Sequence, residues 1–556
     1  MAPTKSTPRI LIVGAGPSGL ALALALLQNG IEVRIIDKLQ SPQLGQRGAA
    51  IQPRALELYG LLGILPDMLS WAGPFQKIVF HNGEKPDKVW DHVSYGKASP
   101  DIPYPDLVMI GQDKAESVLR LHLQDRFGLK VESGLILTGF EQTDKGVTVR
   151  IRRDENERQT EELCEYGWVI GADGAKGVVR KLAGFSYDGE TRDKQRFING
   201  DIHIIEGLDR EYSHRWGDIG RDGVGLRPVE HSKSLFQYVV GGTDVDVDQL
   251  LSDRGALLNH IIKATRREDI KFGELVTIEE WRPNIRMANK FSDRRVFIIG
   301  DAAHIHSSSG GQGITSCIQD AMNLSWKLGL VERGLAPPSL LETYNEERRP
   351  VIEEMLNIST GILDRILGNS ITSAPATRTP DIRQFGVNYR WSSIVVNEDV
   401  LSVEPRKNLV TSAGAYGAEK GDIHAGDRVP EAPGLVNIKN GLITSVFEIL
   451  TCSKHTALIF TQDAQADALL LEAVRSFPVG TCNFVVVFPR ISKPDSDGLA
   501  GRDELLFLQD SAGYAYRHYL AYQGPKVVLI RPDGVIGAIC TSTEGLSMYR
   551  QKVFWS

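Results

Sequence analysis

The sequence predicts an α/β protein in which a parallel sheet covered by helices carries an inserted β-sheet region and precedes a small α/β unit. Up to about residue 345, apolar strand-like runs alternate with helical patterns, as in parallel sheets covered by helices. Short β-rich runs at 202–205 and 235–240 mark the insertion, and strand-like runs at 484–488 and 527–530 mark the final unit. With 556 residues and 42% hydrophobic content, the chain is long enough for about two to four domains.

The first expected element is a strand–turn–helix–strand unit between Arg9 and Asp37. An apolar run, Ile10–Val13, leads straight into Gly14–Gly19, and an Ala- and Leu-rich stretch leads to a second apolar run that ends at Asp37. This order of strand, glycines, helix, strand and terminal acid is typical of a dinucleotide-binding site. A purely structural glycine turn is the alternative.

The residues of this unit have separate roles in binding a dinucleotide. Gly14 permits the tight turn out of the strand, Gly16 lets the backbone approach a pyrophosphate, and Gly19 lets the helix lie against the sheet. The N-terminus of the helix, which includes Ser18, then faces the anion. Asp37 ends the second strand, where its carboxylate can accept hydrogen bonds from a ribose diol.

The uncharged run from Ile10 to Leu27 also has a membrane interpretation. Its glycines and proline argue against a spanning helix or a signal-peptide core. A buried parallel strand followed by a helix packed on a sheet explains the same apolarity. No later stretch looks like a membrane span, so we expect a soluble cytoplasmic protein with no membrane partner.

Charge and cysteine content exclude further classes. The net charge of -7 and the lack of a basic run with interleaved aromatics give no footprint for nucleic acid. Five scattered cysteines without a Cys-x-x-Cys pair argue against a disulfide framework, a zinc site or a dithiol centre, and for a reducing compartment. His304 and His306 have no nearby third ligand, so we expect no metal.

Three later stretches have simple structural interpretations. The mixed charges of residues 152–158 lie between apolar runs and predict the solvated tip of a hairpin. Residues 340–366 read as a helix with a kink or restart at Pro350. Residues 372–426 are rich in Ser, Thr, Ala, Gly and Pro, which predicts mostly linker.

Two further motifs place a glycine and a carboxylate at the end of an apolar strand. Residues 168–174 run into a tight Asp-Gly turn, and residues 295–304 carry a Gly-Asp pair after their strand. A glycine-rich turn at 310–313 then leads into a helix.

Together, the three motifs resemble those of the flavoprotein aromatic hydroxylases, the single-component FAD monooxygenases of the phenol hydroxylase type. The likeness covers nearly the whole chain. It implies that NADPH or NADH reduces bound FAD and leaves, that O2 adds to the reduced ring, and that a C4a-hydroperoxide hands one oxygen to a small phenolic or polyketide-like aromatic substrate. The lack of a second GxGxxG unit fits a transient reductant.

The resemblance implies a role in cofactor binding for individual residues. The first glycine motif and Asp37 would hold the ADP half of FAD. Asp301 would bind the ribityl chain. The turn that contains Gly311 and Gly313 would present backbone N–H groups to the flavin, where negative charge accumulates on reduction.

Four more residues match family positions around the cofactor. Asp173 and Gly174 match a motif linked to both FAD and NADPH binding. Arg47 matches an arginine near the flavin, and Gln112 a polar residue that helps to seat FAD. The alternatives are that Asp173 only shapes a turn and that Arg47 and Gln112 are ordinary surface residues.

Three positions depart from the family pattern. Ser308 stands where many relatives have proline, Thr315 where they have asparagine, and Gly177 where serine is common. The first two border the flavin ring and bear on its environment, and the third bears on NADPH binding.

The inserted region offers candidates for substrate activation. A phenol titrates near ~10, so a base or a positive neighbour is needed at neutral pH. His203, Arg227 and Tyr238 lie in the insertion, and Arg286 lies before the Gly-Asp strand. Strand alternation places Tyr238 and Gln237 on opposite faces, and packing is the alternative role for a tyrosine in a strand.

The resemblance also implies the domain boundaries and a thioredoxin-like C-terminal unit. Without paired cysteines that unit cannot exchange thiols, so we expect a structural or dimer-forming role, which would make the protein a homodimer. The expected boundaries are 1–75, 110–185 and 290–370 for the FAD-binding domain, 76–109 and 186–289 for the substrate-binding domain, 371–425 for a linker, and 426–556 for the thioredoxin-like domain.

Two other classes of function share these features. A flavin oxidase or an enzyme of oxidative rearrangement would have its flavin reduced by substrate alone. A non-catalytic binding protein could keep the architecture without flavin.

Overall fold

Buried apolar strands form the central sheet of the first part of the chain. The computed structural model describes residues 8–91, 97–155, 158–307, 309–368, 380–398, 414–417, 422–462, 468–491 and 504–555. The central sheet is parallel except at its β20 edge, as expected of strands covered on both faces. Its order is β20 (Ser292–Asp293), β21 (Val296–Ile298), β12 (Trp168–Gly171), β1 (Ile10–Val13), β2 (Val33–Asp37) and β8 (Glu132–Ser133). Of these, β1, β2, β12 and β21 confirm strands predicted from the sequence.

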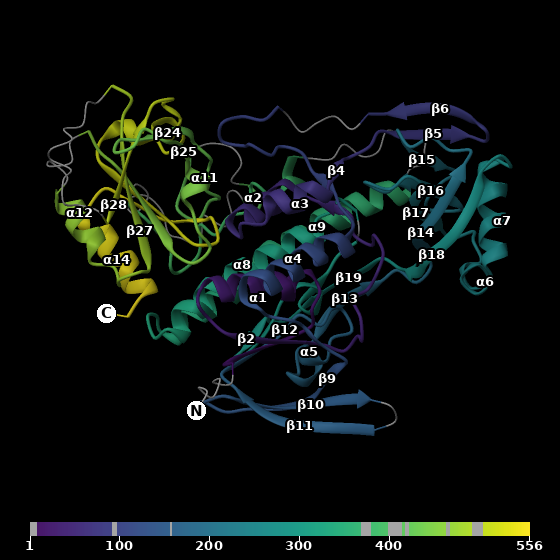
Figure 1. Ribbon diagram of the computed structural model, residues 1–556, viewed down its shortest axis with the longest axis horizontal. Coiled ribbons are helices and arrows are strands. Elements are labelled where there is room, and N and C mark those ends of the chain that lie inside the picture. Colours follow the sequence, from purple (N-terminus) through teal and green to yellow (C-terminus); the bar gives the residue numbers. More distant parts are fainter. Residues whose placement is uncertain are drawn as a thin grey trace.

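Helices cover this sheet and explain the uncharged run near the N-terminus (Figure 1). Helix α1 (Pro17–Gln28) packs against α4 (Gln112–Phe127) and α8 (Gly313–Glu332), and it is buried from Ser18 to Leu26. No helix among the described residues has the length and apolarity needed to cross a membrane. Other helices of this part are α2 (Pro53–Leu61), α3 (Leu65–Trp71), α5 (Val178–Leu182) and α9 (Glu342–Gly368). The helix predicted at 340–366 is confirmed by α9, which continues through Pro350 without a restart.

The insertion forms a seven-stranded sheet with two unlike faces, at the right of Figure 1. One face packs apolar side chains against α6 (Val247–Ser252) and α7 (Arg254–Thr265). The other face carries Asp201, Arg227 and Gln237. The strand order is β18 (Lys271–Trp281), β14 (Phe197–Glu206), β17 (Leu235–Gly241), β16 (Gly223–Pro228), β15 (Ser213–Trp216), β5 (Ile78–Asn82) and β6 (Lys85–Trp90).

Three smaller sheets complete the first part. The predicted hairpin is confirmed by β10 (Val147–Glu155) and β11 (Arg158–Tyr166), although residues 156 and 157 at its tip lie outside the described residues. The other strands are β9 (Leu135–Gln142) beside that hairpin; β13 (Tyr187–Thr191), β19 (Asn284–Ala288) and β22 (His304–Ile305) in one sheet; and β3 (Ala50–Ile51), β7 (Val108–Met109) and β4 (Gly73–Pro74) in the other.

The C-terminal unit is built on an eight-stranded mixed sheet. Its helices are α11 (Val446–Ile449), α12 (Ala468–Arg475), α13 (Tyr514–His518) and α14 (Thr543–Val553). All five cysteines of the chain are free. The strand order is β23 (Val396–Asn397), β30 (Ile536–Cys540), β29 (Lys526–Ile530), β26 (His455–Phe460), β27 (Cys482–Phe488), β28 (Leu505–Asp510), β24 (Pro433–Asn437) and β25 (Ile443–Ser445).

The strand β23 corrects the expected linker at 371–425. It pairs with β30 and so belongs to the C-terminal sheet, and Val395 and Val396 are buried. The prediction was wrong here because the short apolar segment is surrounded by residues typical of turns and linkers. Much of the expected linker lies outside the described residues, namely 371–379, 399–413 and 418–421. Ser308, which stands where many relatives have proline, also lies outside them.

Buried charges join the C-terminal unit to α8 and α9. Arg531, just after β29, contacts Glu347 of α9 at 2.7 Å, and Glu347 contacts Lys327 of α8 at 2.8 Å. All three side chains are 0% exposed. Burial alone would raise the pKa of Glu347, but Arg531 and Lys327 outweigh it and lower that pKa. The carboxylate is therefore ionised and matched by two cations.

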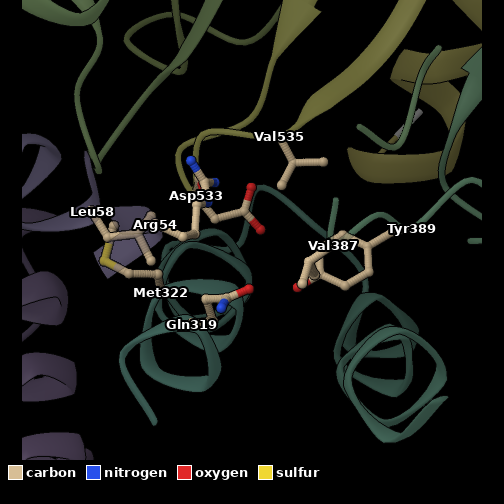
Figure 2. Close-up of a pocket in the computed structure, with 8 residues that line it drawn as sticks. All are labelled: Arg54, Leu58, Gln319, Met322, Val387, Tyr389, Asp533 and Val535. Atoms are coloured by element: carbon tan, nitrogen blue, oxygen red, sulfur yellow. The ribbon is translucent and has the colours of Figure 1, made fainter. Parts of the chain in front are cut away.

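A second buried ionic contact anchors the same unit on α2. Arg428 contacts Glu57 at 2.6 Å, and the Arg54 guanidinium donates to the carbonyl oxygens of Asp533 and Gly534 at 3.0 Å. Figure 2 shows the small cavity at this junction, where Arg54, Gln319 and Asp533 come from three different elements. The polar groups of Arg54 and Arg428 are thus paired across the junction.

We expect Arg531→Met to destabilise the protein strongly. The change keeps the length of the side chain but leaves Glu347 short of a partner, and breaking a buried ion pair costs about 3–5 kcal/mol. The melting temperature, followed by circular dichroism, measures this loss. The control Arg221→Met breaks a contact with Asp244 whose side chains are 69% and 44% exposed, where solvent weakens the ion pair and we expect little change in melting temperature. Equal melting temperatures for the two variants would contradict the role of Arg531.

Candidate active site

Three chain-distant loops meet at the carboxyl ends of adjacent strands. Strands β1, β12 and β21 lie side by side in the central sheet. Each is followed by a glycine with a left-handed backbone: Gly14 at φ 107°, Gly174 at φ 75° and Gly300 at φ 58°. L side chains disfavour this region, so the turns depend on glycine. The carboxyl edge of a parallel sheet is where ligands bind in this class of fold.

The loops approach one another too closely for side chains. A Cβ on Gly19 would lie 2.0 Å from the carbonyl oxygen of Gly14, and one on Gly14 would lie 2.3 Å from that of Ala172. A Cβ on Gly300 would lie 2.2 Å from Ser18 Oγ. Real Cβ contacts are never this short, so these glycines let the β1, β12 and β21 loops form one surface.

The first loop has the features of a pyrophosphate site. A Cβ on Gly16 would meet no atom within 4 Å, so its backbone stays open to a ligand at the start of α1. Asp37 accepts hydrogen bonds from the backbone N–H groups of Ala15 at 2.7 Å and Leu39 at 2.8 Å. Each carboxylate oxygen can accept one more donor, such as a ribose hydroxyl.

Arg120 reaches the same loop and was not found from the sequence. Its Nη2 donates to the carbonyl oxygen of Ala15 at 2.9 Å, and its buried Nε has no hydrogen-bond partner among the described residues. A cation beside the helix N-terminus suits a diphosphate. One arginine within a polar helix such as α4 gives no local signal of this role.

Asp173 shapes its turn and also keeps an open oxygen. Its Oδ2 accepts from the backbone N–H groups of Val178 at 2.6 Å and Val179 at 3.1 Å at the start of α5. Its buried Oδ1 has no partner in the described part of the chain. Gly177 is required beside it, because a Cβ there would lie 2.2 Å from Asp173 Oδ1. This explains why serine is absent at that position.

The glycine-rich turn at 310–313 is held by the start of α2. Gln52 Nε2 donates to the carbonyl oxygen of Gly310 at 2.6 Å, and Gln52 N donates to Thr315 Oγ1 at 3.1 Å. Thr315 therefore has a structural partner where relatives have asparagine. Gly311 has φ 62°, and α8 begins at Gly313. The first N–H groups of α8, which have no partner within the helix, therefore lie beside this turn.

The inserted sheet holds the loop that carries Arg47. Arg47 has φ 42°, a strained value for a residue other than glycine. Its carbonyl oxygen accepts from Gln237 Nε2 at 3.2 Å, and its Nη2 contacts Glu279 Oε1 at 3.0 Å. Its buried Nε lacks a partner among the described atoms. Gln112 joins this loop through its backbone N–H, which donates to the Gln46 carbonyl at 3.2 Å.

Arg227 and Asp201 complete the polar face opposite that loop. Arg227 Nη2 donates to Gln46 Oε1 at 3.0 Å, and Arg227 also pairs with Glu230. Asp201 Oδ2 accepts from Gln46 N at 3.0 Å, whereas its buried Oδ1 has no partner in the described residues. Burial raises the pKa of Asp201. The sequence did not single out Asp201, although it lies beside Gln237 across β14 and β17.

The placement of Tyr238 corrects the expectation that it touches substrate. Tyr238 lies in the apolar cluster with α6 and α7, on the face away from Arg47, and its hydroxyl donates to the Thr277 carbonyl at 3.1 Å. His203 lies on the polar face, where Nδ1 contacts Ser234 Oγ at 2.8 Å. Arg286 lies apart, in the β13–β19–β22 sheet, where it donates to the Tyr187 carbonyl at 3.2 Å.

His304 bonds to an acid, and the structure shows no cluster around it that fits a metal. Its Nε2 contacts Asp320 Oδ2 at 2.7 Å. In the described part of the chain, no three His, Cys, Asp or Glu side chains are placed to hold a metal ion.

Taken together, the glycine loops, Asp37 and the exposed Asp301 define the class of dinucleotide-binding flavoproteins. The open backbone at Gly16 and the unpartnered oxygen of Asp173 fit the phosphates and hydroxyls of FAD. Residues 7–359 match the family described as FAD binding domain. The chain belongs to this family, among the FAD-dependent monooxygenases.

Curated relatives span nearly the whole chain. It is 32% identical to a flavin-dependent monooxygenase of Mycobacteroides abscessus, with 98% of this chain and 99% of that protein covered. It is 28% identical to a pentachlorophenol 4-monooxygenase of Sphingobium chlorophenolicum, with 95% and 93% covered. A 6-methylpretetramide 4-monooxygenase of Streptomyces rimosus is also 28% identical, with 97% and 92% covered.

Solved structures share the fold over the same length. The flavin-dependent monooxygenase PieE, in complex with FAD and substrate, has a TM-score of 0.80 at 20% identity, and 99% of this chain and 98% of that chain are covered. Aklavinone-11 hydroxylase, with FAD and aklavinone, has a TM-score of 0.77 at 20% identity, with 99% and 100% covered.

We expect Gly16→Ala to weaken FAD binding without weakening the fold. The added methyl group has open space in the protein alone but occupies the approach of a pyrophosphate. The dissociation constant of FAD, measured by fluorescence on reconstituting the apoprotein, should rise about tenfold or more, which is about 1.4 kcal/mol. The control is Gly139→Ala in β9, outside the cofactor loops, where an added Cβ also meets no atom within 4 Å. This control should leave the dissociation constant of FAD unchanged. A lower melting temperature of the Gly16→Ala apoprotein would contradict this interpretation.

Proposed function

We propose that this protein hydroxylates a small phenolic or polyketide-like aromatic with FAD, O2 and NAD(P)H. Family membership and the cofactor loops support the flavin chemistry. When bound, FAD would take electrons from NAD(P)H and activate O2 for transfer to the substrate. The curated relatives named for a chlorophenol and a pretetramide support an aromatic substrate.

The observation that carries this proposal is the set of unsatisfied polar atoms between the inserted sheet and the Arg47 loop. Arg47 Nε, Asp201 Oδ1 and Glu230 Oε2 are buried without hydrogen-bond partners among the described residues. Buried polar groups are normally paired, and each unpaired group costs free energy. A polar ligand on this face of the sheet would satisfy them, and the apolar face could not serve.

Asp201 and Arg227 are suited to activate a phenol there. A phenol becomes a better nucleophile when it loses its proton, and its ordinary pKa is near ~10. A carboxylate with a raised pKa is a stronger base, and the guanidinium of Arg227 favours the resulting anion. Both groups are mostly buried, which limits water around the reacting atoms.

A cytoplasmic location and a homodimer belong to the same proposal. Five free cysteines are compatible with a reducing compartment. The ionic junction with the C-terminal unit supports the structural half of that unit's expected role.

The second candidate function is a flavin oxidase or an enzyme of oxidative rearrangement, because proteins with other activities share this fold. The Diels-Alderase PyrE3 has a TM-score of 0.64 with this chain at 21% identity. Whether NAD(P)H or the substrate reduces the flavin therefore distinguishes a monooxygenase from an oxidase.

We expect NADPH to reduce the bound flavin faster when a suitable phenol is present. Stopped-flow mixing without oxygen, over a panel of monocyclic and polycyclic phenols, should show an acceleration of about tenfold or more in the loss of flavin absorbance for the best ligands. Aerobic turnover with 18O2 should then place one labelled oxygen in the product. Reduction by the aromatic compound alone would indicate an oxidase, and no reduction by NADPH or NADH would indicate a binding protein.

We also expect Asp201→Asn to lower kcat/KM by about 10²-fold for phenols that are neutral at pH 7, because a general base contributes about that much. The loss should be small for a polychlorinated phenol that is already ionised. Tyr238→Phe is the matched control on the apolar face and should leave both rates unchanged. An equal loss for neutral and ionised phenols would refute a proton-accepting role for Asp201.

A further inference from the structure

We propose that Asp320 of α8 is a positioning residue that fixes the turn bearing Asp301, and so sets the affinity for FAD. This inference rests on the cofactor and does not depend on which aromatic compound is hydroxylated. Asp320 does not belong to any of the three motifs. It is fully buried in α8, and the turn that it holds is the separate segment from Gly300 to His304.

One oxygen of Asp320 joins both ends of the turn. Asp320 Oδ2 accepts from the backbone N–H of Gly300 at 3.0 Å and contacts His304 Nε2 at 2.7 Å. Asp301 lies between these two residues, in the short helix Gly300–Ala302. Gly300 has no freedom to adapt, because its left-handed backbone packs against Ser18. The carboxylate thus closes a ring around the residue expected to meet the ribityl chain.

The other oxygen is held by a buried arginine of α9. Arg348 Nε donates to Asp320 Oδ1 at 2.7 Å, and both side chains are 0% exposed. The same guanidinium donates to the Ser316 carbonyl at 3.2 Å and to the Tyr389 hydroxyl at 2.9 Å. This fork fixes the plane of the carboxylate, because a bidentate or branched arginine sets geometry as well as charge.

The carboxylate is ionised in this setting. Burial alone would raise the pKa of Asp320, but His304 and Arg348 outweigh it and lower that pKa. An ionised acceptor gives shorter and stronger hydrogen bonds than a neutral one. Its bond to the Gly300 N–H therefore fixes the start of the turn, beside the hydrogen bonds that Tyr187 and Arg180 donate to the carbonyl oxygens of Asp301 and Ala302.

The neighbour of Arg348 provides a matched comparison. Glu347 is equally buried and ion-paired, but it faces Lys327 and Arg531 at the C-terminal junction, not the Gly300 turn. A general loss of stability would follow from altering either residue. A change in cofactor affinity would follow only from altering the Asp320–Arg348 pair.

The test compares Asp320→Asn, Arg348→Lys and Glu347→Gln. The three measurements are the dissociation constant of FAD on reconstituting the apoprotein, the visible circular dichroism of the bound flavin, and the melting temperature of the apoprotein. We expect the first two variants to raise the dissociation constant about tenfold or more and to change the dichroism, since a hydrogen bond to a charged group is among the stronger ones in a protein. Glu347→Gln should lower the melting temperature with less than about a twofold change in affinity.

A double variant guards against failure to fold. Asp320→Asn leaves Arg348 buried without an anion, whereas Asp320→Asn with Arg348→Met removes both charges and avoids that cost. The double variant should fold and still bind FAD more weakly. Wild-type affinity and dichroism in it, or an equal loss of affinity in Glu347→Gln, would overturn the proposal.

Discussion

The close approach of backbone to backbone at the carboxyl edge of the central sheet is the constraint on which the rest of the structure depends. Gly14, Gly19 and Gly300 leave no room for a methyl group, so strands far apart in the chain end in one continuous surface. That surface includes the open backbone at Gly16, the carboxylate of Asp173 and the guanidinium of Arg120, which together suit a phosphate-rich cofactor. The helices around it then have a second task, which is to keep these loops in register.

The inserted sheet answers a different requirement. A sheet in this position must pack on one side and meet a ligand on the other, and alternation along β14, β16 and β17 separates the two. On the polar side, Gln237 donates a hydrogen bond to the Arg47 carbonyl, and Glu279 pairs with the Arg47 guanidinium. The face that we propose for the substrate is therefore bonded to the loop of Arg47, the residue expected near the flavin, so the two proposed sites would share one set of contacts.

Local patterns predicted the strands, the glycine turns and the hairpin because each depends on neighbours in the sequence. They failed where the deciding partner is distant. Alternation separates Gln237 from Tyr238 but cannot say which face meets the helices, and Tyr238, a candidate for touching substrate, lies on the face that packs against them. Asp320, Glu347 and Arg531 read as ordinary charges in helices and loops, since only the folded chain buries them together. The strand at Val396 was hidden because its partner β30 lies far along the chain.

The ionic junction between Glu347 and Arg531 has a consequence for how the protein is made. These residues lie 184 positions apart, so a growing chain on the ribosome completes α9 long before the arginine that neutralises its buried acid is synthesised. Until then Glu347 has Lys327 as a partner but lacks the second cation that completes its buried set of contacts. Docking of the C-terminal unit on α8 and α9 is therefore completed only after Arg531 has been synthesised.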